Sequence, residues 1–191
     1  LPPFYNHPDY IRVLSQSIQE DLKDKKWEHL LFSYHGIPER HIRKSDITKS
    51  HCKINKRCCQ TDSKAHEFCY RHQCYETTRQ VAEYLELKEG TYSTSFQSRL
   101  GVDPWLQPYT DQTIARFAKK GIKNMAIVTP AFVSDCLETL EEIGMEAVED
   151  FEEKGGEELH VIPCINTRTD WVNVMSRWID QWAKAETVSS A

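Results

Sequence analysis

Two hydrophobic periods alternate along this chain. Four short runs of apolar and β-branched residues have the length and the flanking residues of buried strands: 27–34, 91–96, 124–129 and 159–165. Around them, apolar residues recur every three or four positions, which predicts helices at 7–23, 68–87, 110–120, 134–151 and 170–184. Strands that alternate with helices imply right-handed crossovers. The sequence therefore predicts an α/β fold with a parallel four-stranded sheet flanked by helices.

Two stretches depart from this alternation. Residues 39–64 are rich in Lys, Arg, His, Cys and Ser without a clean period, so we expect an insertion loop there. The cysteine-rich insertion, which includes the cysteines after this loop, spans 46–74. Residues 97–108 form a second expected loop, and long loops in compact domains are often functional. Ligands of parallel sheets bind outside the carboxyl ends of the strands. The residues that follow each strand are therefore the first candidates for chemistry.

Composition narrows the classes of function. The chain has 191 residues and a formal net charge of −5. A binder of duplex nucleic acid is usually basic, so we expect no nucleic-acid partner. No apolar run approaches the roughly 20 residues that span a bilayer, and no signal peptide is recognisable at the start, which predicts a cytoplasmic protein. Peripheral contact with a membrane stays open, and Leu1 in place of methionine predicts a piece of a longer chain.

Cysteines are concentrated in one segment. The chain has seven, and five of them lie within 23 residues: Cys52, Cys58, Cys59, Cys69 and Cys74. Without a secretory signal, such a local group favours metal or cluster binding over disulfides. The spacing lacks the two C-x2-C pairs of a typical zinc ribbon. Zinc in the same ligands and disulfides in an oxidised sample both remain alternatives.

His35 stands where the first predicted strand ends, ahead of Gly36 and Pro38. Glycine lets the backbone turn and proline stops the strand, so the imidazole is expected over the cleft on a stiff support. Neutral imidazole binds a metal or accepts a proton near pH 7. An ordinary surface or capped histidine is the alternative, and position alone does not decide between them.

Carboxylates recur along the helix predicted at 134–151. Glu138, Glu142, Glu146 and either Glu149 or Asp150 are spaced to share one face. Carboxylates crowded together raise one another's pKa values, which suits proton relay or cation handling. A solvated acidic face is the alternative, although this row begins at a strand's carboxyl end.

We also predict how the helix at 134–151 begins and which of its faces is buried. We expect Ser134 to cap the helix and Asp135 to suit its positive end. A separate apolar face is expected to be buried, formed by Leu137, Leu140, Gly144, Ala147 and Phe151.

The loop after the second strand offers two ligand-binding side chains. Arg99 could meet a carboxylate, and Trp105 offers a flat apolar face to a planar ligand. Ordinary loop packing explains both residues equally well.

Four strings of this sequence resemble the ferrochelatases, in the same order and with similar spacing. They are 35–38 (HGIP), 96–99 (FQSR), 104–110 (PWLQPYT) and 134–140 (SDCLETL). The resemblance runs from about residue 2 to residue 180. It implies a Rossmann-like chelatase domain, with 1–191 as the C-terminal half of an enzyme whose similar N-terminal domain is absent from this chain.

The resemblance implies a reaction and roles for the matched residues. Ferrochelatases insert Fe²⁺ into protoporphyrin IX or a related porphyrin, which forms haem and releases two protons. His35 would accept protons or deliver metal, and Glu138 would lie on an acidic helix with a π-type widening, both touching the substrate iron. The resemblance adds a polar path for substrate, protons or metal, formed by Ser134, Asp135, Glu142, Gln97, Ser98, Arg99 and Trp105.

The cysteine segment departs from the usual family pattern. Roughly 20 extra residues lie near 46–68, before the match resumes at 73–78. The arrangement resembles a bacterial subgroup with an internal 2Fe–2S cluster, for which four thiolates suffice. The expected ligands are Cys52, Cys59, Cys69 and Cys74, with Cys58 as the substitute for Cys59. A chelatase for another metal or tetrapyrrole, or a redox- or metal-sensing module, remains the alternative function.

Overall fold

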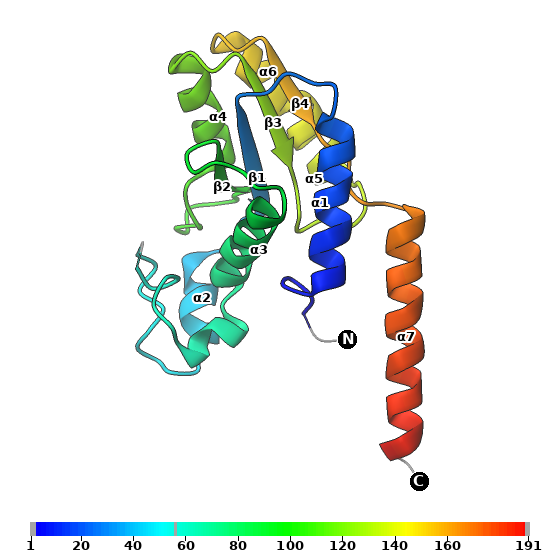
Figure 1. The fold of residues 1–191 in the computed structure, drawn as a ribbon. Helices are drawn as coiled ribbons and strands as arrows, with labels where there is room; N and C mark the ends of the chain where they lie inside the picture. Colours follow the sequence, from blue (N-terminus) through cyan, green and yellow to red (C-terminus); the bar gives the residue numbers. More distant parts are fainter. Residues whose placement is uncertain (1–2, 56, 190–191) are drawn as a thin grey trace.

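The computed structural model describes residues 3–55 and 57–189, with side chains as far as 184. Its elements run in this order (Figure 1): α1 (Pro8–Leu22), β1 (His29–His35), α2 (Glu39–Ser45), the 3-10 helix η1 (Lys64–Phe68), α3 (Tyr70–Tyr84), β2 (Tyr92–Gln97), α4 (Thr110–Lys119), β3 (Asn124–Val128), α5 (Leu137–Leu140), the π-helix η2 (Glu142–Ala147), α6 (Val148–Glu153), β4 (Glu158–Val161) and α7 (Thr169–Ser189).

The four strands form one parallel sheet in the order β2-β1-β3-β4. In its register, His35 at the end of β1 lies beside Gln97 at the end of β2. The predicted α/β fold with a parallel four-stranded sheet is confirmed. The carboxyl ends of β1 and β2 therefore bring the 35–38 and 96–99 strings together.

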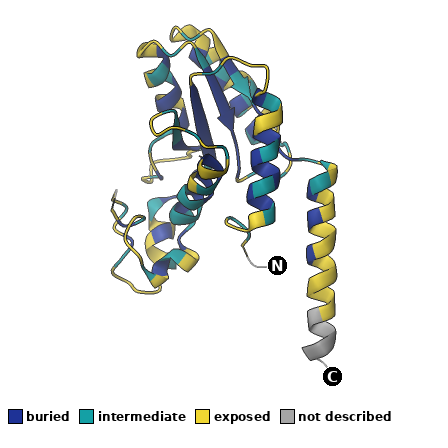
Figure 2. Ribbon diagram, in the orientation of Figure 1, coloured by how far each residue is buried: buried dark blue, intermediate teal, exposed yellow. Residues whose placement is uncertain are grey.

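Both faces of the sheet are covered by helices. Successive strand residues point to opposite faces, so Phe32 and Leu31 belong to separate cores. Phe32 packs with residues of α1, α3 and α7, whereas Leu31 packs with residues of α4, η2 and α6. In Figure 2 the strands are buried between these layers, and residues 179–184 of α7 are exposed.

The segment after β1 is more ordered than predicted. Residues 39–45 form helix α2, where a loop was expected, with an ion pair of 2.7 Å between Arg43 and Glu39. Ile42 is its buried residue. A helix of two turns with a single apolar anchor leaves no readable period, which explains the error.

The helix predicted at 134–151 is interrupted. Cys136 caps it and α5 begins at Leu137, so the predicted cap at Ser134 is wrong. The middle widens into the π-helix η2, as the resemblance implied. Leu137 and Leu140 are 73% and 60% exposed, and their predicted burial is also wrong. Ala147 and Phe151 are buried as predicted, but Gly144 is only half-buried, and the wider π turn places Ile143 in the core instead.

The cysteine segment packs against the body of the domain. Cys52, Ala65 and Cys69 are buried in the same core as α3. The carboxylate of Asp46 accepts hydrogen bonds from the backbone N–H groups of Cys52, Thr48 and His51, which lower its pKa. This carboxylate fixes the start of the insertion. Within the described part of the chain, no helix is both long and apolar enough to cross a membrane.

Candidate functional site

His35 ends β1 at the carboxyl edge of the sheet, where its side chain is half-buried. Its Nδ1 lies 2.6 Å from the carbonyl oxygen of Gly36. A carbonyl only accepts, so Nδ1 carries the proton and Nε2 is the basic nitrogen. The strand thus presents an imidazole with one nitrogen available for a proton or a metal.

Gly36 allows β1 and the following loop to approach each other closely. Its N–H donates to the carbonyl of Gln97 at 2.8 Å. A Cβ at this position would lie 2.8 Å from that same oxygen and 3.2 Å from the ring of Trp105. Trp105 is therefore packed over Gly36, with its ring centre 6.4 Å from that of His35. The two carboxyl-edge motifs form one packed unit.

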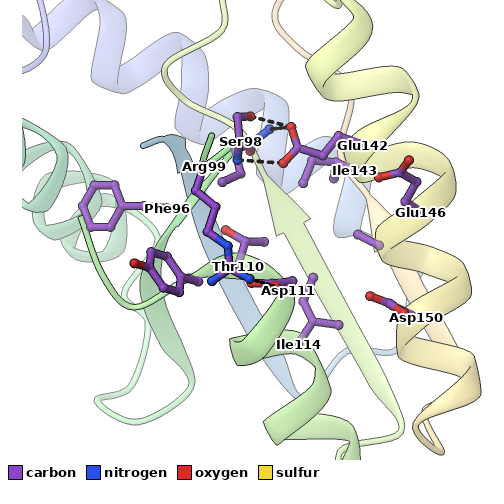
Figure 3. Close-up of a pocket in the computed structure, with 13 residues that line it drawn as sticks. Phe96, Ser98, Arg99, Thr110, Asp111, Ile114, Glu142, Ile143, Glu146 and Asp150 are labelled. Carbon is purple, nitrogen blue, oxygen red and sulfur yellow. Dashed lines mark hydrogen bonds and ion pairs between the residues drawn. The ribbon is translucent and has the colours of Figure 1, made fainter. Parts of the chain in front are cut away.

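The loop after β2 is joined to the acidic helix (Figure 3). Glu142 accepts from the backbone N–H of Ser98 at 2.7 Å and from the Ser98 hydroxyl. Gln97 donates from Nε2 to the carbonyl of Glu138 at 2.9 Å. Ser98 adopts a positive φ of 63°, which turns the chain toward the helix. These contacts fix the distance between the sheet edge and the carboxylate row.

A cleft of about 490 Å³ lies between these elements. Its nine lining residues are His35, Ser98, Arg99, Leu100, Leu137, Glu138, Glu141, Glu142 and Glu146. The Cys136 thiol, by hydrogen bonding, and His35, by its charge, hold the pKa of Glu138 below its ordinary value. The imidazole and the carboxylates that the sequence singled out therefore converge on one space.

A second hollow of about 220 Å³ continues the acidic row. Figure 3 shows Glu142, Glu146 and Asp150 following one another along η2 and α6, opposite Asp111 on α4. Glu142 lines both this hollow and the cleft. Carboxylate oxygens are ligands that divalent cations accept, so the row can pass a cation or protons between the two spaces.

The chain belongs to the ferrochelatase family. The family's model matches residues 1–183. Curated ferrochelatases of Pseudomonas fluorescens (strain Pf0-1) and Stutzerimonas stutzeri (strain A1501) are each 45% identical to 92% of this chain. That of Opitutus terrae is 43% identical over 96% of it. The chain spans about half the length of these ferrochelatases, 51% to 53%.

Four residues expected on the ferrochelatase path lie outside the cleft lining: Ser134, Asp135, Trp105 and Gln97, of which Gln97 lines the second hollow. Ser134 is exposed before α5, and Asp135 is held by its neighbours. The Asp135 carboxylate accepts from Asn166 Nδ2 at 2.6 Å, from Thr139 at 3.1 Å and from the Cys164 N–H at 3.2 Å. Burial opposes ionisation, but hydrogen bonds from Asn166, Cys164 and Thr139 keep the pKa of Asp135 below its ordinary value. A role of Ser134 or Asp135 in the path stays a prediction.

Arg99 and Trp105, the two candidates in the loop after β2, already make contacts within the protein. Arg99 lines the cleft, forms an ion pair with Asp111 at 3.1 Å and lies over the Tyr109 ring at 4.3 Å. Trp105 packs against Gly36 and is not among the nine lining residues, so its contact with a planar ligand stays a prediction.

Leu100 and Leu137 were missed as site residues. They are 77% and 73% exposed and line the cleft, Leu100 from the loop after β2 and Leu137 from the start of α5. Large apolar side chains held in water beside a cleft are typical of a ligand surface. Their only signal in the sequence was an apolar residue after one matched string (Leu100) and within another (Leu137), which does not reveal the side to which it points.

The cysteine segment forms a separate group of thiols. Hydrogen bonds from the thiols of Cys59 and Cys52 lower the pKa of Cys69 to about 5. Arg71 donates from Nη1 to the sulfurs of Cys59 at 3.5 Å and Cys58 at 3.7 Å. Cys58 and Cys59 therefore both face one guanidinium, although adjacent residues were not expected to share a site.

Cys74 has a different environment. Its thiol is buried on α3, and this burial raises its pKa, although a hydrogen bond with the Tyr70 hydroxyl acts in the opposite direction. It lines a small hollow of the core with Phe4 and Tyr10. Among the described residues, no three or more His, Cys, Asp or Glu side chains are arranged around a single ion. Cys58 thus lies with Cys59 on one guanidinium, whereas Cys74 is buried on α3, and which of the two is a ligand stays a prediction.

Proposed function

We propose that the full-length protein inserts Fe²⁺ into a porphyrin, with protoporphyrin IX as the expected substrate. The observation that carries this proposal is the convergence of His35 and Glu138 on one cleft, in a chain of the ferrochelatase family. This chain is about half as long as its relatives, so the N-terminal domain of the same enzyme would supply the opposite wall.

The reaction replaces two pyrrole protons with one Fe²⁺. His35 would accept a proton at Nε2, because Nδ1 already donates to a carbonyl. Glu138 and Glu142 would bind the incoming cation or carry protons away along the acidic row. Proton transfer by positioned groups contributes a factor of about 10²–10⁴. Leu100 and Leu137 would contact the apolar face of the macrocycle at the mouth of the cleft.

The test replaces one carboxylate of the row with its amide. In full-length protein, Glu138→Gln should retain porphyrin binding and lose about 10²-fold or more of the rate of Fe²⁺ insertion. Glu149→Gln is the matched control, because Glu149 lies further along the acidic segment, on α6, is exposed, and does not line the cleft. Wild-type turnover in Glu138→Gln contradicts its role, and equal losses in both variants indicate a general charge effect.

We propose further that the cysteine segment holds a 2Fe–2S cluster. Four thiols fit it by their placement: Cys52 and Cys59 hydrogen-bond Cys69, and Cys58 lies beside Cys59 on the same guanidinium. Each iron of such a cluster takes two protein thiolates, so three ligands around a single ion are not required. This set replaces Cys74, one of the four expected ligands, with Cys58. When bound, the cluster would supply one-electron redox chemistry.

Analysis of iron and acid-labile sulfide tests the cluster and its ligands. Anaerobically purified full-length protein should be coloured and contain two irons and two sulfides per chain. Cys58→Ser should lose them, and Cys74→Ser should keep them. The opposite pattern would restore Cys74 as a ligand, and a colourless protein containing zinc would refute the cluster. A cytoplasmic location forms part of the proposal, because its reducing conditions keep such thiols free.

A further inference from the structure

Arg71 is buried at the start of α3, two residues after Cys69, with 7% of its surface exposed. Its Nη1 donates to the carbonyl of Asn55 at 2.9 Å and to the sulfurs of Cys59 and Cys58. Its Nη2 donates to the hydroxyl of Tyr75 at 3.4 Å, and the guanidinium lies over the Tyr75 ring at 5.1 Å. One cation thus joins the cysteine segment to the helix behind it.

A buried guanidinium needs a counter-charge. Arginine does not lose its proton in proteins, and burying an unpaired charge is costly. The ionisable groups that act most strongly on the charge of Arg71 are the Tyr75 phenol and the thiols of Cys59 and Cys58, rather than a carboxylate. Its Nε is buried without a partner among the described atoms. The negative charge that balances Arg71 is therefore expected on the sulfurs of Cys58 and Cys59.

The backbone around those two sulfurs is also held in place. His51 and His66 each donate from Nε2 to the carbonyl of Cys58, at 2.7 Å and 3.0 Å. His72 donates from Nδ1 to the carbonyl of Cys59 at 3.2 Å, and its ring stacks on that of His66 at 3.6 Å. Three imidazoles thus fix the carbonyls of one dipeptide, which leaves its two sulfurs turned toward Arg71.

We propose that Arg71 is the counter-ion of the thiolate centre and a positioning residue that raises its reduction potential. This inference rests on the proposed cluster. Four thiolates and a 2Fe–2S core carry net negative charge, and reduction by one electron adds to it. A buried positive charge that donates hydrogen bonds to two ligand sulfurs stabilises the more negative state. Removing this charge makes the centre harder to reduce.

The same helix supplies a matched control. Arg79 lies eight residues further along α3, is exposed, and forms ion pairs with Glu76 at 2.6 Å and Glu83 at 2.9 Å. Arg79→Gln removes one positive charge from the same helix without touching a cysteine. Arg71→Lys retains the charge but loses the planar fork that reaches both sulfurs.

The experiment is a redox titration of full-length, anaerobically purified protein with dithionite, followed by visible absorbance. Arg71→Gln should lower the midpoint potential by at least about 59 mV, a tenfold change in the one-electron equilibrium. Arg79→Gln should leave it unchanged, and Arg71→Lys should fall between Arg71→Gln and wild type.

The outcomes separate this inference from the cluster proposal. A coloured wild type with the same midpoint in Arg71→Gln overturns the role of Arg71 and leaves the cluster standing. A wild type without iron and sulfide refutes the cluster itself. Where Arg71→Gln is isolated without cluster, Arg71→Lys decides: a midpoint below wild type supports the inference, and a wild-type midpoint overturns it.

Discussion

The contact at Gly36 allows the geometry of the cleft to be tested through one methyl group. In Gly36→Ala, the new Cβ would lie 2.8 Å from the carbonyl oxygen of Gln97 and 3.2 Å from the ring of Trp105. A carbon atom does not approach a backbone oxygen that closely, so β1 and the loop must separate by several tenths of an ångström. The side chains of both motifs would move with them.

The cost follows from three contributions. Overpacking of this kind costs about 1–3 kcal/mol. Weakening the hydrogen bond from Gly36 to Gln97 adds up to about 1 kcal/mol. Alanine restricts the unfolded chain and returns about 0.4–1 kcal/mol. The net loss of unfolding free energy is therefore about 0–3.6 kcal/mol, with a middle value of about 2 kcal/mol. A loss of about 2 kcal/mol lowers the Tm by roughly 4–8 °C for a chain of this size.

Thermal unfolding by circular dichroism and porphyrin affinity by fluorescence quenching measure the two consequences in full-length protein. Gly144→Ala is the matched control, because its Cβ would meet only the carbonyl of Thr139, at 3.3 Å, and alanine suits a helix. We expect Gly36→Ala to have a lower Tm and a lower porphyrin affinity than wild type. The unfolding free energy of Gly144→Ala should stay within about 1 kcal/mol of the wild-type value. A Gly36→Ala protein with wild-type Tm and affinity would show that the close approach does not shape the cleft.

Two further predictions concern stability. Burial lowers the pKa of His29 to about 4, so the unfolded chain takes up a proton at higher pH than the folded one, and unfolding free energy falls as pH drops from about 6.5 toward 4. After allowance for solvent screening we expect about 1–2 kcal/mol, measured as the shift in urea midpoint between pH 7 and 5; an equal shift in His29→Gln would contradict it. Asp135→Ala should cost about 2–4 kcal/mol by leaving its buried donors unpaired, while the folded enzyme retains Fe²⁺ insertion. Loss of insertion at wild-type Tm would instead place Asp135 on the path.

The strands, and the segments after them that carry candidate site residues, could be predicted from the sequence because each strand has its own local pattern. β1 and β3 are short apolar runs with clear ends, and a parallel sheet places their following loops at one edge. His35 and Glu138 were found for the same reason: His35 ends β1, and Glu138 lies on the first helix after β3. Local patterns were therefore enough to bring the imidazole and the carboxylate row to one cleft.

The errors arise where longer-range contacts decide the structure. Leu137 and Leu140 fit a regular helix period, but the π turn at η2 changes the phase, and the chain leaves both exposed. Whether Cys74 is a ligand stays a prediction: it fits the spacing of the cysteine group, and its helix buries it beside Tyr70. Arg71 gave no signal beyond its charge, because its pairing with sulfurs depends on how the insertion folds back on α3.

The most direct test of the account is Fe²⁺ insertion by full-length His35→Ala. Anaerobic protein is mixed with Fe²⁺ and protoporphyrin IX, and haem formation is followed by its absorbance. His41→Ala is the matched control, because His41 is an exposed histidine on α2 outside the cleft lining. The account predicts that His41→Ala makes haem at the wild-type rate, and that His35→Ala still binds porphyrin but loses about 10²-fold or more of the insertion rate. Insertion at the wild-type rate by a folded His35→Ala protein would contradict the assignment of this cleft.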